Sequence, residues 1–158
     1  MDAVTDKSDS PGVIALPPLL YGGTFLVGLA LHLLWPVHLL SAVPARVAGA
    51  VFVLASGVIA RWAERAMQRA GTNILPTRPT TTIVSDGPYQ FTRNPLYVAS
   101  TGLFIGLTLL LNSLWPLLLL PPLLALVEWG VIRREERYLE RKFGDAYLAY
   151  KSRVRRWL

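Results

Sequence analysis

Residues 96–127 read "LYVASTGLFIGLTLLLNSLWPLLLLPPLLALV" and contain no charged side chain. A helix that crosses a membrane needs about twenty apolar residues, so this run is too long for one straight span. Asn112 and Ser113 divide it, and polar residues of this kind favour a turn. We therefore expect two short spans that form a helical hairpin, over residues 95–111 and 114–132.

The rest of the chain predicts two earlier spans and one kink. Residues 13–40 are almost free of charge and predict a span over 14–38, and a second span is expected over 46–69. The second span should leave the membrane as a helix with a wetted face, formed by Arg61, Arg65 and Arg69, and Gly71 should end it. In the fourth span, prolines 116, 121 and 122 predict a kink.

The composition is that of a membrane protein. Of 158 residues, 53% are hydrophobic and 16% are charged, whereas soluble domains have about 25% charged residues. We predict one all-α domain over residues 1–158: an integral membrane helical bundle of about four transmembrane helices, with a cytoplasmic loop (72–94) and a C-terminal segment (133–158). The absence of cysteine excludes disulfides, thiolate nucleophiles and cysteine-ligated metals.

The basic residues lie beside apolar runs and outside any nucleic-acid motif, which favours anionic lipid headgroups over nucleic acid as partners of a chain with net charge +6. Near the C-terminus, helical spacing predicts an interfacial amphipathic helix over residues 145–158. Its apolar face would consist of Tyr147, Tyr150, Val154 and Trp157.

Charge and tryptophan predict the orientation. Lysine and arginine concentrate in the loop before the hairpin and in the C-terminal segment, so the positive-inside rule assigns both to the cytoplasm. With four crossings the N-terminus is cytoplasmic too. Trp35 and Trp115 then fall at the outer interface, and Trp62 and Trp129 at the inner one, as aromatic belts prefer.

This topology returns the loop that contains Arg93 and the helix that contains Glu135 to the same membrane face. Asn94 followed by Pro95 is a favourable N-cap and first-turn pair for the third span, with free backbone N–H groups that suit an anion. Arg93 adds a planar, charged fork suited to a carboxylate. We therefore expect an anion-accepting site at this helix start.

Two stretches carry a family resemblance: "GPYQFTRNPLYVA" (residues 87–99) and "EERYLERKFGDAYLAYKSRV" (residues 135–154). Together they resemble the isoprenylcysteine carboxyl methyltransferases and their bacterial relatives, which include phospholipid methyltransferases. The resemblance implies a small helical membrane enzyme that binds S-adenosylmethionine near the cytosolic surface. The residues that match the two signatures are Arg93, Asn94, Pro95, Tyr97, Glu135 and Glu136.

The sequence departs from this pattern at three positions. Asn94 occupies a place where the eukaryotic enzymes have histidine, so it can form hydrogen bonds but cannot titrate. Ala99 stands where glycine is frequent, which makes a close backbone approach there less certain. Arg155 stands where proline is frequent.

The chemistry of S-adenosylmethionine assigns roles to these residues. Its amino-acid end carries a carboxylate, which suits Arg93 and the helix start, and an ammonium, which suits Glu135 or Glu136. We predict Arg93 and Glu135 as catalytic residues and no metal site. The predicted cofactor-binding residues are Tyr89, Arg93, Asn94, Pro95, Tyr97, Glu135 and Glu136. The acceptor is expected to be lipophilic, either a prenylated cysteine carboxylate or a lipid.

Other interpretations stay open at this stage. The C-terminal signature is also similar to that of membrane NADPH-dependent reductases of the sterol-reductase type, and a non-enzymatic membrane scaffold is a third possibility. Glu135 and Glu136 would then only pair with neighbouring arginines on a wetted helix. His32 and His38 are expected to have packing roles. The oligomeric state is open, because glycines 22, 23, 49 and 57 suit contacts within or between chains.

Overall fold

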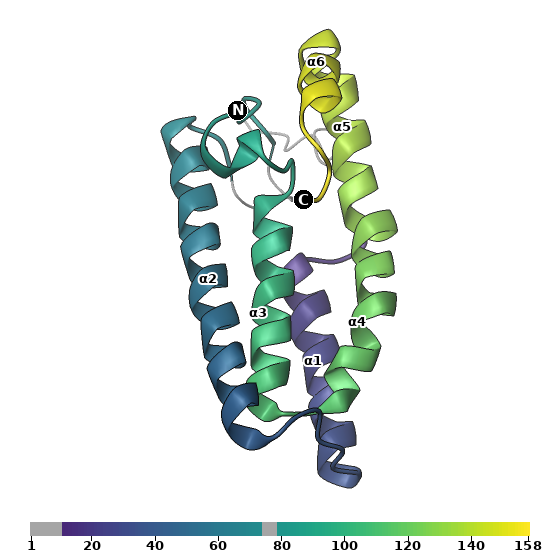
Figure 1. Ribbon diagram of the computed structural model, residues 1–158. Helices are drawn as coiled ribbons and strands as arrows, with labels where there is room; N and C mark the ends of the chain where they lie inside the picture. The colour runs from purple at the N-terminus through teal and green to yellow at the C-terminus, as the bar shows by residue number, and fades with distance from the viewer. Residues whose placement is uncertain (1–10, 74–78) are drawn as a thin grey trace, which may run out of the picture.

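A computed structural model describes residues 11–73 and 79–158. Within these residues all regular secondary structure is helical (Figure 1). Helices α2 and α3 and the continuous rod of α4 and α5 run side by side, and α1 lies behind α3 and α4. The elements are α1 (Pro17–Leu34), α2 (Ala42–Arg69), the 3-10 turn η1 (Gly87–Gln90), α3 (Pro95–Leu111), α4 (Leu114–Val127), the π-helical turn η2 (Glu128–Ile132), α5 (Arg133–Phe143) and α6 (Asp145–Arg153).

The architecture confirms an all-α membrane bundle. Three helical stretches are long and apolar enough to cross a membrane, namely Pro17–Leu34, Ala42–Arg69 and Leu114–Phe143, and α3 is a shorter apolar helix. In the third stretch the apolar part ends at Ile132, and the charged part that begins at Arg133 lies beyond the membrane-spanning segment. Large apolar side chains such as Leu33 and Leu54 point outward and are 75% and 71% exposed, as expected of surfaces that face lipid.

The predicted spans differ from the helices mainly at their ends. Helix α1 stops at Leu34, because Trp35 precedes a proline and adopts φ −138°, ψ 89°, outside the helical region. Helix α2 begins at Ala42, earlier than expected, with Pro44 in its first turn, where a proline is tolerated. The third span coincides with α3 over residues 95–111.

The fourth span passes through Pro121 and Pro122 without ending (Figure 1). It then widens into the π-helical turn η2 before α5 begins. Such turns are rare and are frequent at functional sites. Gly71, the predicted stop, follows the end of α2 with φ +66°, and Gly144 ends α5 with φ +51°.

Helices α2 and α3 approach closely at two glycines. A Cβ atom added to Gly49 would lie 2.8 Å from the Gly106 carbonyl oxygen, and one added to Gly106 would lie 2.9 Å from the Val53 nitrogen. Both glycines therefore serve contacts within the chain. Among the other glycines considered, Gly22, Gly23 and Gly57 have open space around the same position.

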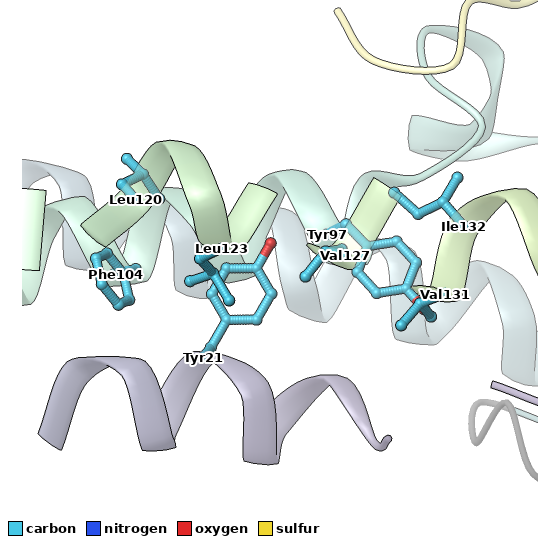
Figure 2. Packing of buried hydrophobic residues seen from close by; sticks show 8 residues of the cluster. All are labelled: Tyr21, Tyr97, Phe104, Leu120, Leu123, Val127, Val131 and Ile132. Carbon is cyan, nitrogen blue, oxygen red and sulfur yellow. The ribbon is translucent and has the colours of Figure 1, made fainter. Parts of the chain in front are cut away.

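The main core joins α1, α3, α4 and η2 (Figure 2). Tyr21 extends from α1 toward α4, and its hydroxyl group forms a 2.9 Å hydrogen bond with Thr101 Oγ1 of α3. Tyr97 lies in the same cluster near η2, at the end that carries the loop. The cluster consists of Tyr21, Tyr97, Phe104, Leu120, Leu123, Val127, Val131 and Ile132.

The two interhelical turns meet at the opposite end of the bundle. The Asn112 side chain accepts hydrogen bonds from the backbone nitrogens of Leu39 and Leu40, at 3.2 and 3.1 Å, and donates to the Leu40 carbonyl at 2.8 Å. Trp115 Nε1 donates to the Trp35 carbonyl at 2.6 Å. Trp35 and Trp115 therefore share this end, as predicted.

Candidate functional site

The loop before α3 and the helix α5 meet at the polar end of the bundle, as the hairpin topology predicts. Arg93 Nη2 lies 3.0 Å from Glu136 Oε1, and both side chains are only 7% exposed. One residue away on α5, Glu135 Oε1 accepts a 2.8 Å hydrogen bond from the Tyr97 hydroxyl group of α3. Residues more than thirty positions apart thus form one buried polar cluster.

A cavity of about 540 Å³ opens beside this cluster. Its volume lies within the range of small-molecule sites. Its polar end lies near Arg93, and its apolar wall continues along α2 and α3 with Gly57 and Leu103. All of the predicted site residues line it: Tyr89, Arg93, Asn94, Pro95, Tyr97, Glu135 and Glu136.

The guanidinium group of Arg93 has unused donors. Its Nη2 pairs with Glu136, but Nε and Nη1 are buried and have no hydrogen-bond partner among the described residues. A buried donor without a partner costs about 1–3 kcal/mol, and more when the group is charged. These two donors, in a residue that lines the cavity, fit an anionic ligand group such as a carboxylate.

Glu135 supplies the complementary charge. No cationic side chain among the described residues is within ion-pair distance of it. Burial raises the pKa of Glu135 to about 7, the Tyr97 hydrogen bond opposes this shift, and the nearby Glu136 carboxylate adds to it. Glu135 can therefore switch between a neutral acid and a carboxylate near neutral pH, and its charged form lacks a cation.

Glu136 is engaged by two arginines. Besides Arg93, it accepts the fork of Arg156, with Nε to Oε1 at 2.9 Å and Nη2 to Oε2 at 2.7 Å. The expectation of a wetted helix with neighbouring ion pairs is wrong for Glu136, which is 5% exposed and pairs with residues of other segments. Glu136 is covered because α5 packs against α6 and because Arg156 of the C-terminal segment binds its carboxylate.

Asn94 does not cap α3 as predicted. Helix α3 does begin at Pro95, but the Asn94 side chain makes no capping hydrogen bond, because its backbone (φ −128°, ψ 52°) departs from the extended conformation of a cap. Its Nδ2 instead donates to the Arg156 carbonyl at 2.9 Å. Asn94 therefore holds the C-terminal segment against the site.

The C-terminal segment differs from the predicted interfacial helix. Helix α6 ends at Arg153, and Val154 is extended, so Val154 and Trp157 do not continue the helical face. Tyr147 and Tyr150 are 2% and 5% exposed and line the cavity, away from any lipid surface. The Tyr150 hydroxyl group donates to the Tyr89 carbonyl at 2.7 Å.

Tyr147, Tyr150 and Arg156 are site residues that sequence reasoning missed. A signal for the two tyrosines was present, since the stretch that carries the family resemblance extends to Val154. Burial raises the pKa of Tyr147, and it raises that of Tyr150 to about 12, so both hydroxyl groups stay protonated and can donate hydrogen bonds at neutral pH.

Comparison with known proteins identifies the family of this chain. Residues 44–146 match the family described as phospholipid methyltransferase. The chain belongs to the phospholipid methyltransferase family. In this family member the matched region begins in α2 and includes the buried polar cluster of Arg93, Tyr97, Glu135 and Glu136. It stops before Tyr147.

One curated relative shares a short region with this phospholipid methyltransferase family member. It is described as an uncharacterized protein of Haemophilus influenzae and is 70% identical over 27 residues, which are 17% of this chain. The chain thus spans 43% of the length of that relative. No solved structure matches the chain.

Proposed function

We propose that this protein transfers a methyl group from S-adenosylmethionine to a lipophilic acceptor at the cytoplasmic face of the membrane. The observation that carries the proposal is the pair of buried, unbonded donors on Arg93 beside the unpaired carboxylate of Glu135, in one cavity. Membership of the phospholipid methyltransferase family supports the reaction class. When bound, S-adenosylmethionine supplies a methyl group on a positively charged sulfur, ready for displacement.

The charges of Arg93 and Glu135 are complementary to the carboxylate and the ammonium in the amino-acid part of S-adenosylmethionine. Arg93 would hold the carboxylate with Nε or Nη1, which lie on different edges of the guanidinium group and each offer one charged hydrogen bond. Glu135 would hold the ammonium. Glu136 is the weaker candidate for that role, because Arg93 and Arg156 already occupy its oxygens.

The chain's contribution to rate is then mainly positioning. Two charged contacts fix the orientation of the cofactor, and holding two reactants in line replaces an encounter in solution. The positive charge on sulfur disappears in the transition state, so a carboxylate against sulfur would favour the ground state. Glu135 is therefore more useful at the ammonium than at the reacting centre.

The acceptor is inferred to bind along the apolar part of the same cavity. Val53 and Gly57 of α2 and Leu103 of α3 line it within the apolar length of these helices. An acyl or prenyl chain from the bilayer can lie there with its polar group toward Arg93 and Glu135. A phospholipid amine and a prenylated cysteine carboxylate both meet this description. The exposed Arg153 and Arg155 suit anionic headgroups around the site.

Methyl transfer and ligand binding test the proposal together. Protein in lipid nanodiscs is incubated with methyl-labelled S-adenosylmethionine and either membrane phospholipids or a farnesylated cysteine. We expect label in one of the two acceptors and loss of labelling in Arg93→Gln and Glu135→Gln. At a hundredfold excess over its dissociation constant, the cofactor should stabilise the wild-type protein by about 2.7 kcal/mol.

Two results would overturn the proposal. Saturable NADPH binding without S-adenosylmethionine binding would favour a reductase. Failure of both ligands to raise the thermal midpoint would favour a non-enzymatic membrane protein. An exposed pair outside the cavity lining provides the matched control, since Arg69→Gln removes only the Arg69–Asp86 contact, whose side chains are 62% and 53% exposed.

A further inference from the structure

The last residues of the chain cross the site as an extended strap, here defined as residues 154–158. The backbone of the strap is bound to the loop before α3: Arg93 N donates to the Arg155 carbonyl at 2.9 Å, and Thr92 Oγ1 donates to the Arg156 carbonyl at 3.0 Å. Figure 1 shows the chain ending beside the polar end of α3. The strap is thus held by atoms that do not depend on its side chains.

The side chain of Arg156 binds two carboxylates, those of Glu136 in α5 and Glu128 in η2. Its Nε and Nη2 bind both oxygens of Glu136, and its Nη1 donates to Glu128 Oε1 in the π-helical turn. Trp157 Nε1 donates a 3.1 Å hydrogen bond to the other oxygen of Glu128, Oε2. Arg156 therefore uses its planar fork and its remaining terminal nitrogen at once, which a lysine cannot do.

The contacts between Arg156 and Glu136 limit how Arg93 can bind Glu136. Glu136 Oε2 faces Arg156, so Arg93 contacts the carboxylate through Nη2 and Oε1 only. If Arg156 were absent, Glu136 would have a free oxygen next to the two unbonded donors of Arg93. A two-point ion pair would then form between Arg93 and Glu136, because buried donors and acceptors seek partners. That pair would use one of the two free donors, and the cavity would keep only the other.

We propose that Arg156 is a positioning residue of the cofactor site, which occupies Glu136 so that Nε and Nη1 of Arg93 stay available to the carboxylate of the ligand. This inference rests on the proposed function and extends it to a residue beyond the region that matches the family, which ends at residue 146. Arg156 acts by binding Glu136 and does not itself contact the ligand.

Two ligands separate a positioning role from a purely structural one. S-adenosylmethionine carries the amino-acid end, and methylthioadenosine has the same nucleoside with a neutral thioether in place of the sulfonium and without that end. In Arg156→Gln we expect affinity for S-adenosylmethionine to fall about tenfold or more, and affinity for methylthioadenosine to stay unchanged. Arg156→Lys should recover only part of the loss. Calorimetric titration of the full-length protein in nanodiscs measures both affinities.

Arg155→Gln is the matched control, because the Arg155 side chain is exposed and only its carbonyl contacts the site. It should leave both affinities unchanged. A lower thermal midpoint in Arg156→Gln with unchanged affinity for both ligands would overturn the proposal, and so would an equal loss for both. If the wild-type protein binds neither ligand, the proposed function fails, and this outcome is distinct from a failure of the Arg156 role alone.

Discussion

The two ends of the bundle treat polar side chains in opposite ways. At the turn end, Asn112 uses both atoms of its amide group, and Trp115 Nε1 is bonded to a carbonyl of the neighbouring turn. At the site end, Arg93 keeps two buried donors without a partner, and Glu135 has no cation, among residues 11–73 and 79–158. The turn end is arranged for stability, whereas the site end retains a cost that a ligand can remove.

His32 is an exception to this comparison. Its Nδ1 also lacks a hydrogen-bond partner within the described part of the chain, and its ring packs edge-on against His38 at 5.7 Å between centroids, in keeping with the expected packing role. Burial of one imidazole nitrogen costs much less hydration than burial of a guanidinium group. The difference between the ends therefore lies in the charged groups.

The largest effect is expected at the site end. Arg93→Gln removes the positive charge and the guanidinium donor of the proposed carboxylate contact, and a hydrogen bond to a charged group contributes about 1.5–3 kcal/mol. We expect the affinity for S-adenosylmethionine to fall about a hundredfold or more, as measured by calorimetric titration. Arg69→Gln should not change it, and an unchanged affinity in Arg93→Gln would remove the basis of the comparison.

Substitution of the glycines between α2 and α3 should destabilise the bundle as a whole. Gly49→Ala adds a Cβ atom 2.8 Å from a backbone carbonyl, and overpacking of this kind costs about 1–3 kcal/mol. Gly23→Ala, in open space, should be neutral or slightly stabilising. Thermal midpoints in one detergent provide the test, and equal midpoints would show that the close approach of α2 and α3 does not matter.

Asn112 sharpens the comparison from the turn end. Asn112 has φ +52°, a conformation that glycine adopts freely, so Asn112→Gly removes the three side-chain hydrogen bonds without adding backbone strain. We expect a loss of about 1–2 kcal/mol, and about 1 kcal/mol more for Asn112→Ala. Neither variant should alter the affinity for S-adenosylmethionine, since a change there would couple the two ends.

The smallest effect is a pH dependence centred on Glu135. Its pKa of about 7 means that the carboxylate needed for an ammonium forms as pH rises, so affinity should increase about tenfold from pH 5.5 to 7. Stability should change in the other direction: the folded pKa is raised, so its contribution is present below about pH 4.5 and is lost as pH rises through about 7. Glu135→Gln should flatten both profiles, and profiles that persist in this variant would assign them to another group.

Much of the membrane part was predictable from local pattern. The charge-free run, divided by Asn112 and Ser113, predicts α3 and the start of α4 at their observed residues, because both features act over a few positions of the chain. The meeting of Arg93 with Glu136 follows from the hairpin topology, which does not depend on side-chain detail.

The strap and the tail tyrosines could not be predicted from periodicity. Val154 and Trp157 continue a helical spacing, yet the chain is extended there, because hydrogen bonds to the loop replace those of a helix. These bonds join residues some sixty positions apart, such as Asn94 and Arg156, and use backbone carbonyls that every residue type has. No local sequence pattern encodes such a contact.

Labelling from one side of the membrane tests the comparison of the two ends most directly. The chain has no cysteine, so single cysteines at the exposed positions Gln90, Arg137 and Ser41 can be labelled separately in sealed inverted vesicles with a membrane-impermeant maleimide. We predict that Gln90→Cys and Arg137→Cys react together from the cytoplasmic side, and that Ser41→Cys reacts only after the vesicles are opened. Reaction of positions 90 and 137 from opposite sides would contradict a single site at one end of the bundle.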